Sequence, residues 1–250
     1  MKNTPLVTII TVVFNGEKYL EKTIQSVINQ NYSNIEYIVI DGGSSDRTIN
    51  IIKKHEDVIS FWKSEQDAGI YDAMNKGLSL ANGDWLNFMN AGDQFASHKS
   101  ISNFMERSSD EKSLVFSDIL LVDSDGSERK IVQNGLKKYF FYRNICHQSV
   151  FYNHKKLKKL MYYNLKYEVA ADFDLLMRIY SMDSVNFSVK NNSFDIKYLD
   201  GGLSSISCLE RVDDRRDILK KHLRYLSIDY FMNLFKAKVN RLQCKKHKSV

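Results

Sequence analysis

The hydrophobic positions of the first 90 or so residues alternate between two kinds of pattern. Runs of adjacent apolar and β-branched residues, typical of strands buried on both faces, lie at 6–14, 35–40, 59–63 and 85–89. Apolar residues at helical spacing lie between them, at 19–30, 47–55 and 70–80. Ser45 or Asp46 can cap the second of these helices, and Gly83 follows the third. The alternation predicts a parallel α/β sheet with right-handed crossovers, whose ligands bind beyond the carboxyl ends of the strands.

The pattern changes after about residue 95. The segment Leu114–Val122 predicts a strand, and Asp125-Gly126 predicts a hairpin turn before Ile131-Val132. An aromatic-rich loop is expected over 140–152, a helix over 172–182 and a long amphipathic helix from 211 to about 241. No linker, repeat or low-complexity segment interrupts the chain, so we expect one α/β domain with a C-terminal helical appendage.

Composition, the length of the apolar runs and the cysteines indicate what kind of protein this is. The chain has 250 residues, of which 43% are hydrophobic, and no run reaches the ~20 apolar residues that span a bilayer. The apolar run near the N-terminus is too short for a secretory signal and lacks a cleavage site, so we expect a cytoplasmic location. The three cysteines are far apart and odd in number, which favours reduced thiols over a disulfide framework or a zinc site.

Polar residues follow three of the predicted strands. Phe14-Asn15-Gly16 follows the first, Asp41-Gly42-Gly43 the second and Asn90-Ala91-Gly92-Asp93 the fourth, and these ends should share one sheet edge. Asp41 is suited to accept a hydrogen bond from a nucleotide base, and Asp93 to hold a divalent cation that bridges a diphosphate. Each aspartate taken alone is more often a turn or cap residue. No G-x-G-x-x-G or Walker motif is present.

Two further segments carry candidate chemistry. Tyr71 and Asp72 lie in the first turn of the third predicted helix, near the same sheet edge, although an exposed helical face explains them equally well. Asp172 lies at or near a helix N-cap, where a carboxylate can be purely structural. His147-Gln148 lies in the aromatic stretch, where a structural histidine is the better default.

Together these segments resemble glycosyltransferase family 2. The resemblance covers about residues 5–180 and is carried by four ordered segments, Val7–Asn15, Ile38–Asp46, Asp67–Gly77 and Asn82–Asp93. It implies a GT-A fold, in which a Rossmann-like nucleotide-binding half shares a mixed central sheet with an acceptor-side half. It divides the chain into a catalytic domain over 1–210, with donor-binding and acceptor-side halves of about 1–95 and 96–210, and a basic tail over 211–250.

The resemblance also implies roles for particular residues. It assigns donor binding to Thr11, Val13, Phe14, Asn15, Asp41, Gly42, Asp67, Tyr71, Asn75, Asn90, Ala91 and Gly92. The segment that ends in Asp93 matches the metal-binding D-x-D-type segment, and Asp93 is its one remaining carboxylate, for Mn²⁺ or Mg²⁺. Asp172 matches the catalytic base in preference to Asp174, and His147, Gln148 and Asp174 fall on the acceptor side.

The implied reaction inverts the configuration of the transferred sugar. Asp172 would accept the proton of the acceptor hydroxyl as it attacks C1, while the metal would neutralise the departing diphosphate. The donor is expected to be a UDP-sugar. The Gln-x-x-Arg-Trp motif of processive synthases is absent, which favours addition of one sugar. The expected acceptor is a polyprenyl-diphosphate-linked saccharide of O-antigen, capsule or exopolysaccharide synthesis.

Three rival functions fit less well. A nucleotidyltransferase would carry a Gly-rich, basic loop after the first strand, where this chain has Asn15-Gly-Glu-Lys18. A non-catalytic nucleotide-sugar-binding module would lack the base or the metal carboxylate, yet both Asp172 and Asp93 are present. Only the basic tail suggests nucleic acid, and we expect no nucleic-acid partner.

The tail combines positive charge with an apolar stripe. Residues 211–250 contain 12 Lys/Arg and 4 Asp/Glu within a chain of net charge +6. The stripe consists of Leu219, Leu223, Leu226, Tyr230, Leu234 and Val239, widened by Phe231 and Phe235. Such a helix suits the anionic inner face of the cytoplasmic membrane, but the same stripe suits packing on the catalytic domain or on a second subunit. The sequence leaves these alternatives open, together with the oligomeric state.

Overall fold

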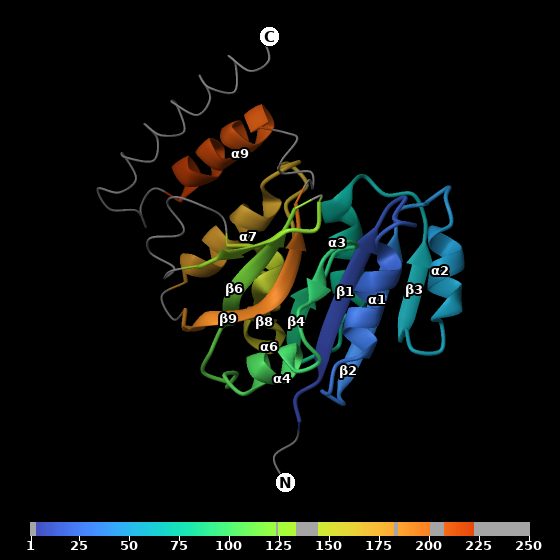
Figure 1. The fold of residues 1–250 in the computed structure, drawn as a ribbon. Coiled ribbons are helices and arrows are strands. Elements are labelled where there is room, and N and C mark those ends of the chain that lie inside the picture. The colour runs from blue at the N-terminus through green and yellow to red at the C-terminus, as the bar shows by residue number, and fades with distance from the viewer. Residues whose placement is uncertain (1–3, 124, 134–144, 183–184, 201–207, 223–250) are drawn as a thin grey trace.

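The computed structural model describes residues 4–123, 125–133, 145–182, 185–200 and 208–222 (Figure 1). Its centre is a mixed sheet with the strand order β3-β2-β1-β4-β8-β6-β9-β5, and β7 pairs with β6. The strands are β1 (Val7–Val13), β2 (Ile35–Asp41), β3 (Phe61–Ser64), β4 (Trp85–Phe88), β5 (Gln94–Phe95), β6 (Leu114–Val122), β7 (Glu128–Ile131), β8 (Val150–Asn153) and β9 (Phe187–Leu199). The helices are α1 (Leu20–Ile28), α2 (Thr48–Lys54), α3 (Ile70–Leu80), α4 (Ser100–Met105), the 3₁₀ turn η1 (His147–Ser149), α6 (His154–Leu157), α7 (Ala171–Tyr180) and α9 (Cys208–Lys221).

The N-terminal half is the predicted parallel α/β unit. β1 pairs in parallel with both β2 and β4, and β2 pairs in parallel with β3. All seven residues of β1 are buried, because alternate side chains enter the two hydrophobic cores on opposite faces of the sheet. Ile10 packs on the face covered by α3 and α7, and Ile9 on the face covered by α1 and α4. A side chain at Gly77 would lie 2.5 Å from Ile10 Cγ2, so this glycine lets α3 approach the sheet closely.

The second half completes the sheet with mixed pairing. β8 runs antiparallel to β4 and to β6, whereas β9 runs parallel to β6 and antiparallel to β5. The expected hairpin is confirmed, since Leu114–Val122 forms β6 and pairs antiparallel with β7. The expected loop over 140–152 is wrong at its end, where Val150–Tyr152 forms most of β8. The residues that precede it, 140–144, lie outside the described part of the chain.

The C-terminal helix packs on the domain. Figure 1 shows α9 lying beside α7, and α9 places Ile218 and Leu219 in the hydrophobic core with 0% and 4% of their surfaces exposed. Leu219 therefore faces protein and is withdrawn from the predicted membrane stripe, whose remaining residues from Leu223 onward lie outside the described chain. In the described part, no helix is long and apolar enough to cross a membrane.

Candidate active site

A cavity of about 780 Å³ lies at the carboxyl ends of β1 and β2, next to the start of α3. This volume falls in the usual range for small-molecule and cofactor sites. The edge is the one predicted for ligand binding in an open α/β sheet. The residues that line the cavity are Val12, Val13, Phe14, Asn15, Gly16, Tyr19, Gly42, Gly43, Gln66, Asp67, Gly69, Ile70, Ala73, Asn90 and Ala91.

The loop after β1 is fastened to the loop after β2. The Asn15 backbone N–H donates to Ser44 Oγ at 2.7 Å, and Asn15 Oδ1 accepts from the Ser45 backbone N–H at 3.0 Å. The φ of Asn15 is 49°, a left-handed conformation that asparagine tolerates better than most residues. The Gly16 N–H donates to Thr48 Oγ1 at 2.8 Å. These bonds hold the two strand ends at one edge, as the sequence predicts.

Asp41 shapes the floor of this cavity rather than lining it. The side chain is fully buried, and its Oδ2 accepts hydrogen bonds from the Gly43 and Ser44 backbone N–H groups at 3.1 and 3.0 Å and from Ser64 Oγ at 2.6 Å. These bonds fix the turn that presents Gly42 to the cavity. A side chain at Gly42 would lie 2.5 Å from Asp67 Oδ2, so any larger residue here would require the Asp67 carboxylate to move.

Most of the predicted donor-binding residues line the cavity, namely Val13, Phe14, Asn15, Gly42, Asp67, Asn90 and Ala91. The other predicted donor-binding residues do not line the cavity and instead form hydrogen bonds with neighbouring segments. Thr11 is buried and donates to the Met89 carbonyl at 2.8 Å. Asn75 exchanges two hydrogen bonds with the Tyr163 backbone, at 2.7 and 2.8 Å, and the Gly92 N–H donates to Thr23 Oγ1 at 2.9 Å.

Sequence reasoning missed several lining residues. Tyr19 lines the cavity with 48% of its surface exposed, beside the more exposed Phe14 at 66%. Tyr19 precedes α1, and an aromatic residue at a helix start gives no signal of ligand contact. Gly43, Gly69 and Ile70 lie within the segments Ile38–Asp46 and Asp67–Gly77 that carry the family resemblance. Their position next to predicted donor-binding residues could have identified them.

The surroundings of Asp93 do not fit those of a metal ligand. Asp93 is 4% exposed and does not line the cavity; its Oδ2 accepts from Gln148 Nε2 at 2.6 Å and its Oδ1 from the Leu199 backbone N–H at 3.0 Å. Burial raises the pKa of this carboxyl to about 6. Within the described chain, no group of three or more His, Cys, Asp and Glu residues could hold a metal ion. Asn90 Oδ1, in contrast, is buried and has no hydrogen-bond partner among the described residues.

Asp172 lies in the first turn of α7 and is 9% exposed. Its Oδ1 accepts from the Phe173 backbone N–H at 2.7 Å and from the Tyr71 hydroxyl at 3.4 Å. Its Oδ2 lies 3.6 Å from His147 Nδ1, and His147 Nε2 lies 3.1 Å from Asn90 Nδ2. Burial, with the nearby Asp172 charge, raises the pKa of Tyr71 well above its usual value, so its hydroxyl stays a donor. Asp172 thus lies beside Tyr71 of α3, and His147 lies between it and Asn90 of the loop after β4.

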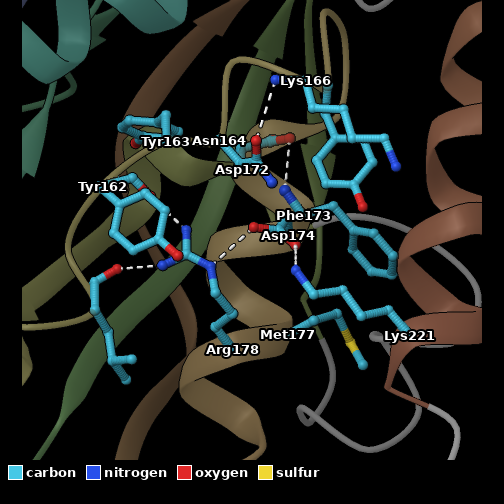
Figure 2. Close-up of polar contacts among 12 residues, drawn as sticks. Tyr162, Tyr163, Asn164, Lys166, Asp172, Phe173, Asp174, Met177, Arg178 and Lys221 are labelled. Atoms are coloured by element: carbon cyan, nitrogen blue, oxygen red, sulfur yellow. Dashed lines mark hydrogen bonds and ion pairs between the residues drawn. The ribbon is translucent and has the colours of Figure 1, made fainter.

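Asp174, the alternative base, is a structural residue in this fold. It is 0% exposed and its Oδ2 accepts from Arg178 Nε at 2.8 Å, one turn along α7, while Lys221 of α9 lies 3.7 Å from Oδ1 (Figure 2). The Arg178 guanidinium also donates to the carbonyls of Leu160 and Tyr162. The Asp174 carboxylate therefore ties α7 to its neighbours, and it is not available to an acceptor sugar.

The fold and this site define a GT-A glycosyltransferase, with a nucleotide-sized cavity on the parallel half and a carboxylate presented by the other half. A family model, "Glycosyl transferase family 2", matches residues 8–176, which is more than half of the chain. The chain therefore belongs to glycosyl transferase family 2 and is a glycosyltransferase.

Bacterial relatives share this assignment. An uncharacterized glycosyltransferase of Mycobacterium tuberculosis is 33% identical over 184 residues, which cover 71% of this chain and 70% of the relative. A PGL/p-HBAD biosynthesis glycosyltransferase of Mycobacterium bovis is 30% identical over 182 residues, with the same coverage. An uncharacterized glycosyltransferase of Haemophilus influenzae is 31% identical over 201 residues, which cover 77% of this chain and 79% of the relative.

Solved structures confirm the fold. The 1–349 fragment of Staphylococcus aureus TarS in complex with UDP-GlcNAc superposes with a TM-score of 0.70 at 16% identity, over 88% of this chain and 66% of that one. The mannosyltransferase PcManGT from Pyrobaculum calidifontis, in complex with GDP-Man and Mn²⁺, gives a TM-score of 0.69 at 15% identity, over 95% and 70% of the two chains. At these identities the likeness shows a shared fold and no more.

Proposed function

We propose that this glycosyltransferase moves one sugar from a UDP-sugar to a hydroxyl of a polyprenyl-diphosphate-linked saccharide, in the assembly of O-antigen, capsule or exopolysaccharide. One observation carries the proposal: the first turn of α3 serves both the cavity and the candidate base. Ile70 and Ala73 line the cavity, and the hydroxyl of Tyr71 between them lies 3.4 Å from Asp172 Oδ1. A donor sugar bound in the cavity would therefore have a carboxylate close by.

The donor assignment is supported by the cavity and by the neighbours. TarS was solved with UDP-GlcNAc and PcManGT with GDP-Man, so both structural neighbours take nucleoside-diphosphate sugars. The cavity of this chain lies at the carboxyl ends of β1 and β2, the edge at which open α/β sheets bind their ligands. Exposed Phe14 and Tyr19 offer aromatic faces to a base or a sugar.

The proposed reaction is a single displacement with inversion. Asp172 accepts the proton of the acceptor hydroxyl while that oxygen forms a bond to C1 of the sugar and the bond from C1 to the diphosphate breaks. An α-linked donor then yields a β-glycoside. The Phe173 N–H donates to Oδ1 of the carboxylate and fixes its plane for the incoming hydroxyl. The Tyr71 hydroxyl, whose nearer acceptor is the Val169 carbonyl at 3.1 Å, lies 3.4 Å from the same oxygen.

A divalent cation remains a prediction for this chain. PcManGT binds Mn²⁺, but the Asp93 carboxylate of this chain is engaged by Gln148 and Leu199, and no step above is assigned to a metal. Initial rates in EDTA, compared with rates in added Mn²⁺ or Mg²⁺, test the cofactor separately from the transfer. Rates that are the same in EDTA and in Mn²⁺ would remove the cation from the account.

The placement at the membrane is also a proposal. A lipid-linked acceptor presents its sugar at the inner face of the cytoplasmic membrane, and the basic residues of 223–250 suit attraction to anionic headgroups. We propose peripheral binding through that segment, with α9 as the packed connection to the catalytic domain.

A donor panel tests the function. The full chain is incubated with UDP- and GDP-sugars, with and without a polyprenyl-diphosphate-linked saccharide, and the release of nucleoside diphosphate is measured. We expect acceptor-dependent release of UDP from one or a few UDP-sugars. Release of GDP alone would overturn the choice of donor, and release that no saccharide acceptor stimulates would overturn the transfer.

A further inference from the structure

The turn η1 is fixed to the loop after β4 by two adjacent side chains. Gln148 Nε2 donates to Asp93 Oδ2 at 2.6 Å, and the imidazole of His147 contacts Asn90. The backbone of η1 is held as well, because Asn87 Nδ2 donates to the Gln148 carbonyl at 2.8 Å. Asn87 is fully buried and Gln148 is 3% exposed. The backbone of His147 is therefore firmly held, and the position of its ring is set by contacts with residues at the carboxyl end of β4.

The contacts of His147 determine which ring nitrogen carries the hydrogen. The Asn90 Nδ2 group, a donor only, lies 3.1 Å from His147 Nε2, so Nε2 of the neutral ring accepts and the hydrogen is on Nδ1. Nδ1 lies 3.6 Å from Asp172 Oδ2, so the N–H is on the ring nitrogen near the carboxylate that we assign as the base. If the Asn90 amide were reversed, its oxygen would face Nε2, and the hydrogen of a neutral ring would have to be on Nε2. The Nδ1 lone pair would then face the Asp172 carboxylate, which is repulsive, so the negative charge of Asp172 favours the amide orientation described here.

We propose that His147 is a positioning residue, which orients Oδ2 of Asp172 for proton transfer and links that orientation to the donor cavity through Asn90. The inference rests on the proposed function, because it assigns Asp172 the role of base. Asn90 lines the cavity, and its buried Oδ1 has no hydrogen-bond partner in the part of the chain that the structure describes. A nucleotide-sugar that donates a hydrogen bond to this oxygen would fix the orientation of the Asn90 amide. The amide would in turn fix the imidazole of His147 and the carboxylate of Asp172.

The geometry favours this role over a merely structural histidine. A buried structural histidine typically forms its hydrogen bond with the backbone, as His154 Nδ1 does with the Gly83 carbonyl at 3.0 Å. His147 instead has 13% of its side chain exposed, contacts a residue of the cavity and approaches the candidate base. Its 3.6 Å separation from Asp172 exceeds a hydrogen bond, and contacts of this kind often shorten only when substrate is bound.

Two conservative substitutions separate the two contacts. An asparagine amide reaches about as far as Nδ1 of histidine, whereas a glutamine amide reaches about as far as Nε2. His147→Asn therefore retains a donor toward Asp172 and loses Asn90, and His147→Gln does the reverse. The matched control is His154→Gln, which removes a buried histidine that contacts the Gly83 carbonyl and neither Asn90 nor Asp172 in the described contacts. For each protein we measure kcat, the KM of the donor, UDP affinity by calorimetry and the thermal midpoint.

We expect His147→Gln to lower kcat by about 10- to 100-fold, since the base loses its orientation, while UDP affinity stays within about twofold. We expect His147→Asn to weaken UDP binding by about 2- to 10-fold, the range for one hydrogen bond, with a smaller loss of kcat. His154→Gln should change the thermal midpoint and leave kcat and KM in place.

Two results would overturn the inference. If the wild type turns over and both His147 variants lose kcat and UDP affinity in parallel with their thermal midpoints, His147 is structural and the proposed function stands. If the wild type shows no acceptor-dependent release from any donor, the proposed function fails first and this inference fails with it.

Discussion

Removal of the Arg178 guanidinium should destabilise the fold more than removal of the Asp172 carboxylate, which we propose as the base. Arg178 Nε lies 2.8 Å from Asp174 Oδ2, with 9% and 0% of the two side chains exposed. The guanidinium also lies over the Tyr162 ring, 3.9 Å from its centroid. In Arg178→Met the Asp174 carboxylate stays buried, and the other cation paired with it in the described chain is Lys221 Nζ at 3.7 Å, on a side chain that is half exposed.

The magnitude follows from the burial of this pair. Breaking a buried pair by removing one partner costs about 3–5 kcal/mol. For a chain of this size each kcal/mol corresponds to about 2–4 °C, so the thermal midpoint should fall by roughly 6–20 °C. Replacing both partners, in Arg178→Met with Asp174→Leu, should recover much of the loss because no buried charge is left unpaired.

The assay is thermal unfolding followed by circular dichroism at pH 7, with Asp172→Asn as the comparison. We expect Asp172→Asn to unfold near the wild type and to be catalytically impaired, which separates a base from a structural carboxylate on the same helix. The reasoning would be refuted by an Arg178→Met midpoint within about 2 °C of the wild type, less than the shift that a loss of 1 kcal/mol produces in a chain of this size.

Three further predictions concern other parts of the molecule. Asp41→Ala should weaken UDP binding about tenfold or more in calorimetry, since the turn that presents Gly42 loses several hydrogen bonds; unchanged affinity would remove Asp41 from the donor site. Burial raises the pKa of Asp93 from 3.8 to about 6, so its contribution to stability is complete below pH 4 and is lost as the pH rises through 6. Urea midpoints from pH 4 to 7 should therefore fall more in the wild type than in Asp93→Asn, and parallel curves would contradict the assignment. A chain that ends at His222 should keep its thermal midpoint and should no longer sediment with anionic vesicles at low salt, whereas the full chain binds and is released by salt; equal sedimentation of both chains would remove the membrane role.

The parallel half of the fold was predictable because its strands and helices are each specified locally. β1 is a continuous β-branched run and α3 carries an apolar face, and the structure has both within a residue or so of the predicted bounds. β9 was not predicted, because Phe187–Leu199 mixes asparagine, lysine and serine with its apolar residues and pairs only with distant segments. The aromatic pattern of 140–152 predicts a loop, although Val150–Tyr152 forms most of a buried strand.

The site was predictable in position and less so in the role of each carboxylate. The segments that end in Asp41 and Asp93 do meet at one sheet edge. The sequence could not show that Asp93 is paired with Gln148 and Leu199, which lie 55 and 106 residues away. Nor could the sequence show that Asp174 forms a buried ion pair with Arg178. Whether an aspartate binds a ligand or holds the fold depends on long-range partners, which only the folded chain brings together.

The central claim is that Asp172 acts as the base in transfer from a bound nucleoside-diphosphate sugar. Its most direct test compares the wild type with Asp172→Asn in two measurements, acceptor-dependent release of nucleoside diphosphate and calorimetric affinity for UDP. The account predicts a fall in kcat of roughly 10²- to 10⁴-fold in Asp172→Asn with UDP affinity unchanged. Equal turnover by the two proteins, or a loss of turnover that only follows a loss of UDP binding, would contradict it.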